Sequence, residues 1–154
     1  CPTNVLDDEL LACSQIAKRW GLELKTMVFP GGTAGNYEVL KKHGYKMYRK
    51  NTEFDLTYPY RDELDILTTT STGSFGRNAN WSQEYYISRY CKIIDKAIMT
   101  NTVAHLWLHP SVDRWTLDNV MPAVMHYAAQ KRETGVLWIG TMKDMADFIN
   151  RDVR

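Results

Sequence analysis

Two apolar segments separated by a helical stretch most constrain what this chain can fold into. Residues 105–110 read HLWLHP, and residues 135–142 read GVLWIGTM. A buried strand, a helix and a second buried strand form the unit from which open α/β sheets and α/β barrels are built. Because these folds place their chemistry at the C-terminal ends of strands, His109 is the first candidate for a functional residue.

Helix and strand patterns alternate over the rest of the chain. Apolar residues recur every three or four positions in a predicted helix over residues 4–20, which Gly21 ends. Ser82 favours the start of another helix, and Thr141 with Asp144 resembles a capping box before the last one. Further helices are predicted over residues 36–43 and within 113–132, and strands over residues 24–29, 45–49, 65–72, 103–108 and 136–139.

This alternation predicts an α/β fold with right-handed crossovers between parallel strands. We count four or five βα units without a linker, so residues 1–154 are expected to form a single domain. A complete (β/α) barrel needs about seven or eight units and roughly 250 residues. The chain therefore fits either an open sheet or the later part of a barrel.

The charge and hydropathy of the chain exclude several kinds of partner. The net charge is +1, with lysines and arginines spread along the sequence, so no electrostatic footprint for nucleic acid or an anionic membrane is expected. No apolar run approaches the ~18 residues that a membrane-spanning helix needs.

The histidines do not form a metal-binding pattern. His105 and His109 lie four apart on a predicted strand, where they are about 13 Å from one another and cannot share one ion. We expect His105 to be a buried structural residue and His109, at the strand end, to be the functional one. No CxxC or HxxEH motif is present, so no metal ligand is predicted within this chain.

The glycine-rich residues 31–35 follow a predicted strand and precede a helix. This position is typical of a phosphate cradle, although the spacing is not GxGxxG. A tight turn with unusual backbone angles explains these glycines equally well.

Several segments, taken in order, resemble a known family. These are Val28-Phe29-Pro30, the run GYKMYR over residues 44–49, HLWLHP over residues 105–110, and Thr141-Met142. In this order they resemble the C-terminal half to two-thirds of a polysaccharide deacetylase with a NodB-homology domain. The resemblance is strongest to the branch associated with bacterial surface-glycan synthesis.

The resemblance implies a distorted (β/α) barrel that removes N- or O-acetyl groups from sugars. In that family a divalent metal, usually zinc, activates water, and a histidine of the last motif donates a proton to the leaving group. His109 matches this catalytic acid. Trp107 stands where the family has a leucine lining the acetyl pocket, and Leu108 and Pro30 are expected to contact the glycan substrate with it.

The family's metal-binding aspartates and its HxxxH motif have no counterpart here. We therefore expect the C-terminal portion of a deacetylase barrel that lacks the first strands, with the metal held only in the intact parent. The missing N-terminal half, or a second copy, would cover its open edge. Two alternatives stay open: a non-catalytic carbohydrate-binding relative that uses Trp81, Trp107 and Trp115, and a small α/β module that binds phosphate through residues 31–35.

Overall fold

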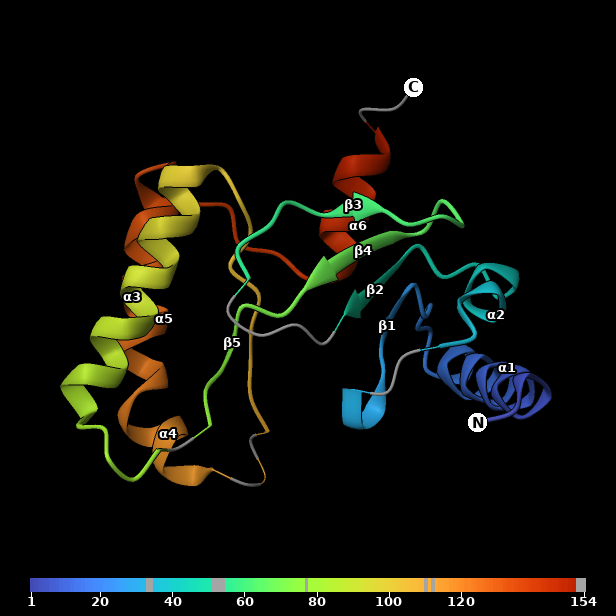
Figure 1. The fold of residues 1–154 in the computed structure, drawn as a ribbon, viewed down its shortest axis with the longest axis horizontal. Helices are drawn as coiled ribbons and strands as arrows, with labels where there is room; N and C mark the ends of the chain where they lie inside the picture. Colours follow the sequence, from blue (N-terminus) through green and yellow to red (C-terminus); the bar gives the residue numbers. More distant parts are fainter. Residues whose placement is uncertain (33–34, 51–54, 77, 110, 112, 152–154) are drawn as a thin grey trace. The chain divides into compact units, whose positions relative to one another are not determined.

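The computed structural model describes residues 1–32, 35–50, 55–76, 78–109, 111 and 113–151 (Figure 1). The chain forms two compact units, each with its own core. We call Cys1–Asn51, Pro59–Thr69 and Gly140–Arg154 the sheet unit, and Thr52–Tyr58 and Thr70–Ile139 the helical unit.

The sheet unit is built on four strands in the order β1-β2-β4-β3. β1 and β2 are parallel, with Thr26 opposite Met47, whereas β3 and β4 are antiparallel. The strands are β1 (Thr26–Val28), β2 (Met47–Lys50), β3 (Tyr60–Arg61) and β4 (Leu67–Thr70), and the helical elements are α1 (Thr3–Arg19), the 3-10 turn η1 (Pro30–Gly32), α2 (Tyr37–Lys42) and α6 (Met142–Arg151).

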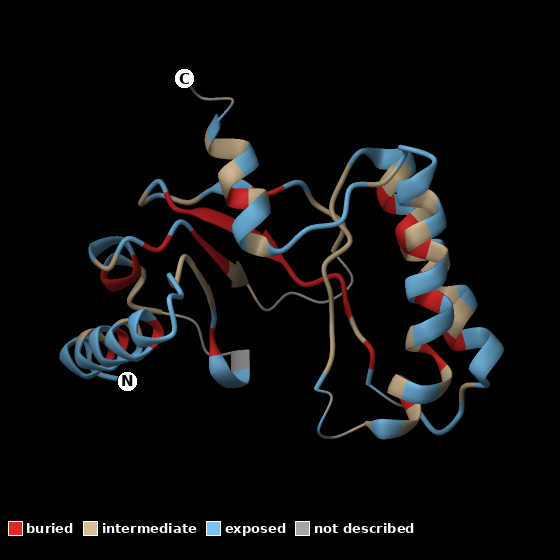
Figure 2. Ribbon diagram, turned by 180° about the vertical axis from the view of Figure 1, so that it is seen from behind, coloured by how far each residue is buried: buried red, intermediate tan, exposed pale blue. Residues whose placement is uncertain are grey.

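Apolar side chains from α1, α2 and the central strands form the core of the sheet unit. Leu6 and Leu10 of α1 pack with Leu40 of α2, and Tyr48 of β2 is 1% exposed. Figure 2 shows β4 buried along its length and β2 buried over its first half. The Tyr48 hydroxyl donates to Asp62 at 2.9 Å, and Asp62 also accepts two backbone N–H groups of the turn between β3 and β4. The core and this turn therefore stabilise each other.

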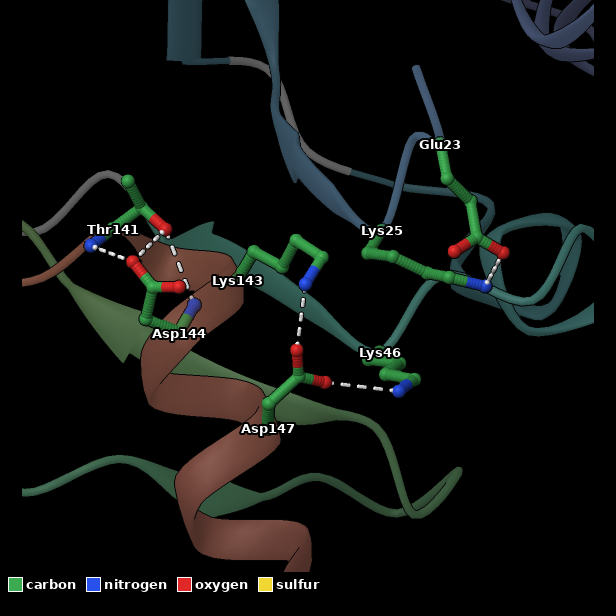
Figure 3. A network of polar contacts seen from close by, with 7 residues as sticks. All are labelled: Glu23, Lys25, Lys46, Thr141, Lys143, Asp144 and Asp147. Atoms are coloured by element: carbon green, nitrogen blue, oxygen red, sulfur yellow. Dashed lines mark hydrogen bonds and ion pairs between the residues drawn. The ribbon is translucent and has the colours of Figure 1, made fainter. Parts of the chain in front are cut away.

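The predicted helices over residues 4–20 and 36–43 are confirmed, with each end within one residue of the observed one. α1 and α2 end before Gly21 and Gly44, whose φ angles of 68° and 75° are left-handed and favour glycine. The capping box of α6 is reciprocal: the Thr141 N–H donates to Asp144 at 2.9 Å, and the Asp144 N–H donates to the Thr141 hydroxyl at 3.1 Å. Figure 3 shows both bonds.

α6 packs on the sheet through its apolar side chains. Ala146 is fully buried in a cluster with Met47 and Leu67, and Met142, Met145 and Ile149 pack against this cluster. On the solvent side, Asp147 bridges Lys143 of its own helix at 2.7 Å and Lys46 at 3.0 Å (Figure 3). This pair of contacts ties α6 to the residue that precedes β2.

The helical unit combines a short parallel pair with a helical layer. β5 (Gly73–Ser74) pairs with β6 (Leu106–Trp107), and the helices are α3 (Gln83–Thr100), α4 (Arg114–Asn119) and α5 (Met121–Glu133). The Ser82 hydroxyl caps α3 by accepting from the Tyr85 N–H at 3.2 Å, as predicted. Pro122 lies in the first turn of α5, where its missing N–H costs nothing.

Two predicted strands are wrong in extent or in kind. The strand over residues 103–108 is reduced to the half-buried β6, and residues 136–139 form no strand. Val136, Trp138 and Ile139 are 54%, 57% and 46% exposed. An apolar run becomes a buried strand only where a neighbouring strand pairs with it and a covering layer packs on it, and none of the described strands pairs with residues 136–139.

The fold class is mixed α/β, with a parallel strand pair in each sheet. The described strands do not close into a barrel. None of the described helices is both long enough and apolar enough to cross a membrane.

Candidate functional site

His109 lies in a pocket of about 360 Å³ in the helical unit. The end of β5, the residues after β6 and the start of α4 contribute its walls. These lining residues are Ser74, Phe75, Gly76, Leu108, His109, Asp113, Arg114 and Trp115. The pocket thus combines three ionisable side chains with two aromatic rings.

The backbone of β5 and β6 positions His109. The Phe75 N–H donates to the Trp107 carbonyl at 2.8 Å, and the Thr72 N–H donates to the His105 carbonyl at 2.9 Å. The Trp107 indole N–H donates to the buried Ser71 hydroxyl at 2.8 Å. These bonds hold β6, which ends two residues before His109, against β5.

Asp113 forms the rim of the pocket at the start of α4. Its carboxylate accepts the Thr116 N–H at 3.0 Å and the Thr116 hydroxyl at 2.5 Å, so it serves as the N-cap of the helix. Thr116 is fully buried, which fixes the position of the carboxylate. Arg114, beside it, pairs with Asp118 at 2.7 Å on the solvent side.

Trp115 presents an aromatic wall that the core supports. Its ring lies 5.8 Å from the fully buried Tyr86 ring, at an angle of 62°. Tyr86 in turn stacks at 6.2 Å on Tyr90.

The structure brings together some of the predicted site residues. Leu108 and His109 line the pocket, and Trp107 contacts the His109 ring without lining the pocket. Pro30 belongs to the sheet unit, where it begins η1. Pro110, the last residue of the HLWLHP motif, lies outside the described residues.

The tryptophans proposed as sugar platforms separate into different environments. Trp115 lines the pocket beside His109. Trp81 packs edge-on against Tyr85 at 5.0 Å and Tyr86 at 4.9 Å, so it contributes to the core of the helical unit.

Sequence reasoning missed Asp113, Arg114 and the residues of the β5 loop. One signal was available for Asp113, because an aspartate before an amphipathic helix is a common N-cap. The loop residues Ser74 and Gly76 carried no signal, since Ser and Gly occur throughout that stretch.

The donors around His109 do not fit a zinc site. A catalytic zinc ion needs three protein ligands, whereas only His109 and Asp113 among the lining residues could ligate one. Over all described residues, no group of three or more His, Cys, Asp and Glu could hold a metal ion.

The glycine segment after β1 is explained in part by backbone geometry. Gly31 has a φ angle of 62°, which a turn at this point requires. Residues 33 and 34 lie outside the described residues. The Asn36 side chain, at the N-cap of α2, donates to the Cys1 carbonyl at 3.0 Å.

Comparisons of this chain with protein-family models, curated proteins and solved structures found no match.

Proposed function

We propose that this chain is part of a metal-dependent polysaccharide deacetylase that hydrolyses N- or O-acetyl groups on a glycan. The observation that supports this most is the pocket in which His109 lies beside Trp115, Asp113 and Arg114. A sugar ring stacks its C–H face on an aromatic wall and bonds its hydroxyls to polar groups. The pocket offers both kinds of contact.

His109 has the role of proton donor in this proposal. Deacetylation adds water to the acetyl carbonyl carbon and breaks its bond to the sugar nitrogen or oxygen. The leaving amine or alkoxide then needs a proton, which an imidazolium can supply. Trp107 packs edge-on against the His109 ring, which lines the pocket.

In this proposal, the metal of the intact parent enzyme is not held by the pocket around His109. Because the pocket donors do not fit a zinc site, its ligands would come from residues outside this chain. We place them in an N-terminal half of the same barrel, or in a second copy that completes it. In the same proposal this chain is a partial (β/α) barrel lacking its first strands, with β5 and β6 as two of its parallel strands.

A non-catalytic carbohydrate-binding protein is the second candidate. The observation that favours it is Trp115 lining a pocket that lacks a metal donor set. In that case binding of a glycan would require Trp115 but not His109.

Acetate release tests the proposal. The complete reading frame that encodes this segment is expressed with zinc and given an oligosaccharide of N-acetylglucosamine. The His109→Ala variant should lose about a hundredfold or more in rate, as expected for a general acid. His126→Ala, which removes an exposed histidine of α5, is the matched control and should keep full activity.

Glycan binding without acetate release would favour the second candidate. An unchanged rate in His109→Ala would refute the proposed role of His109.

A further inference from the structure

A second pocket of the helical unit follows the solvent side of α3. Its volume is about 330 Å³, and Leu56, Tyr85, Ser88, Arg89, Lys92 and Lys96 line it. It shares no lining residue with the pocket around His109. No carboxylate is among the described residues that line it.

The polar lining residues form one stripe along the helix. Tyr85, Arg89, Lys92 and Lys96 follow each other at intervals of four, three and four positions, which places them on the same face of α3. The opposite face carries the buried residues Tyr86, Tyr90, Ile94 and Ala97. With a rise of 1.5 Å per residue, the three cations extend over about 10 Å.

This stripe brings like charges together on one helix face. Cations three and four positions apart on a helix repel one another. Across the described ranges, neither Lys92 nor Lys96 forms an ion pair, and the nearby acid Asp95 pairs instead with Lys131 at 3.0 Å. The last turn of α3 holds no basic residue, so the helix dipole does not account for the stripe.

Both walls of the pocket are held in place. The centre of the Arg89 guanidinium lies 5.1 Å from the Trp81 ring, which packs into the core. Leu56, on the other wall, lies between residues whose backbone is tied down. The Asp55 carbonyl accepts the Thr72 hydroxyl at 2.9 Å, and Thr57 pairs with Val103 in an antiparallel bridge.

We propose that this pocket binds a small ligand that carries two or more phosphoryl groups in a row. Two or three linked phosphoryl groups match a cationic stripe of about 10 Å, whereas a single group would reach only part of it. Arg89 can bind oxygens in a bidentate fashion, and the lysines act as point charges. The hydroxyls of Tyr85 and Ser88 add donors. This site does not depend on the proposed deacetylase activity.

Calorimetric titration of the full chain with inorganic tripolyphosphate tests the proposal. Tripolyphosphate should bind more tightly than inorganic phosphate, and added salt should weaken binding through screening. A nucleoside diphosphate titrated beside pyrophosphate shows whether the ligand is a nucleotide or a phosphate chain alone. A DNA duplex that binds the pocket more tightly than tripolyphosphate would overturn the small-ligand assignment.

Paired variants separate the pocket from general charge. Lys92→Ala with Lys96→Ala should weaken tripolyphosphate binding about tenfold or more. Lys18→Ala with Arg19→Ala removes the same charge from α1 and should weaken it by less than about threefold. Lys92→Arg with Lys96→Arg should retain binding. Equal weakening by the two alanine pairs, or no binding by the unmodified chain, would overturn the proposal.

Discussion

Trp107 and His109 meet edge to face, with ring centroids 5.2 Å apart and ring planes at 83°. Trp107 ends β6 and His109 follows two residues later, a spacing that places side chains on the same side of an extended chain. The residue predicted to shape the substrate pocket therefore contacts the residue predicted to donate the proton. The hydrogen bond that the Trp107 indole N–H donates to the Ser71 hydroxyl holds the indole in this position.

The bond between Trp107 and Ser71 should stabilise the helical unit. Trp107→Phe leaves the fully buried Ser71 hydroxyl without this donor, at a cost of about 1–3 kcal/mol in the free energy of unfolding. Urea denaturation of both single variants and of Trp107→Phe with Ser71→Ala measures the coupling. The double variant should lose less than the sum of the single losses. Strict additivity would contradict the account.

Tyr90 should make stability fall at alkaline pH. Burial, with a smaller contribution from Tyr86, raises the pKa of Tyr90 to about 12, above the tyrosine value of about 10 in an unfolded chain. The contribution of Tyr90 to the free energy of unfolding is therefore complete below pH ~10 and is lost as the pH rises toward 12. Urea midpoints measured across this range should fall less steeply in Tyr90→Phe. Tyr85→Phe, at an exposed position of the same helix, should retain the full slope.

Asp147 should make the sheet unit sensitive to acid. Hydrogen bonds from Lys143 and then from Lys46 lower its pKa from 3.8 to about 2. The contribution of Asp147 to the free energy of unfolding is therefore present above pH ~4 and is lost as the pH falls toward 2. Asp147→Asn should lower the melting temperature at neutral pH but not near pH 2. Asp8→Asn on α1 is the control, and an equal effect of both changes would contradict this prediction.

Gly44 should be required for its backbone angle. Its φ of 75° is unfavourable for alanine, so Gly44→Ala should cost about 1 kcal/mol, although a Cβ there would meet no atom within 4 Å. Gly35 has equal space and no positive φ. Gly35→Ala should therefore change the free energy of unfolding by less than about 0.5 kcal/mol. Chemical denaturation of both variants decides the comparison.

The helices were predictable because their signals are local. The glycines after α1 and α2, the Ser82 cap and the Thr141–Asp144 box act within a few residues of the helix ends that they set. Strands depend on distant partners, which is why residues 136–139 were predicted as a strand but form none, with Val136, Trp138 and Ile139 exposed. The antiparallel pairing of β3 with β4 carried no comparable local signal.

In the candidate site too, one residue was predictable from the local sequence, whereas others depend on the fold. His109 could be chosen from the sequence because it follows an apolar run directly. Asp113, Arg114 and Trp115 join it only because α4 begins where it does, which depends on the path of the chain after β6. The basic stripe of α3 was hidden by a net charge of +1, since an average over the chain does not reveal a local cluster.

The most direct test of the central claim is an NMR titration of the chain with an oligosaccharide of N-acetylglucosamine. The resonances of the His109 ring and the Trp115 indole should shift, while that of the exposed Trp20 indole should not. A glucose oligosaccharide without acetyl groups should bind more weakly at the same residues. Shifts confined to other residues, or none at millimolar sugar, would contradict the claim that this pocket receives an acetylated glycan.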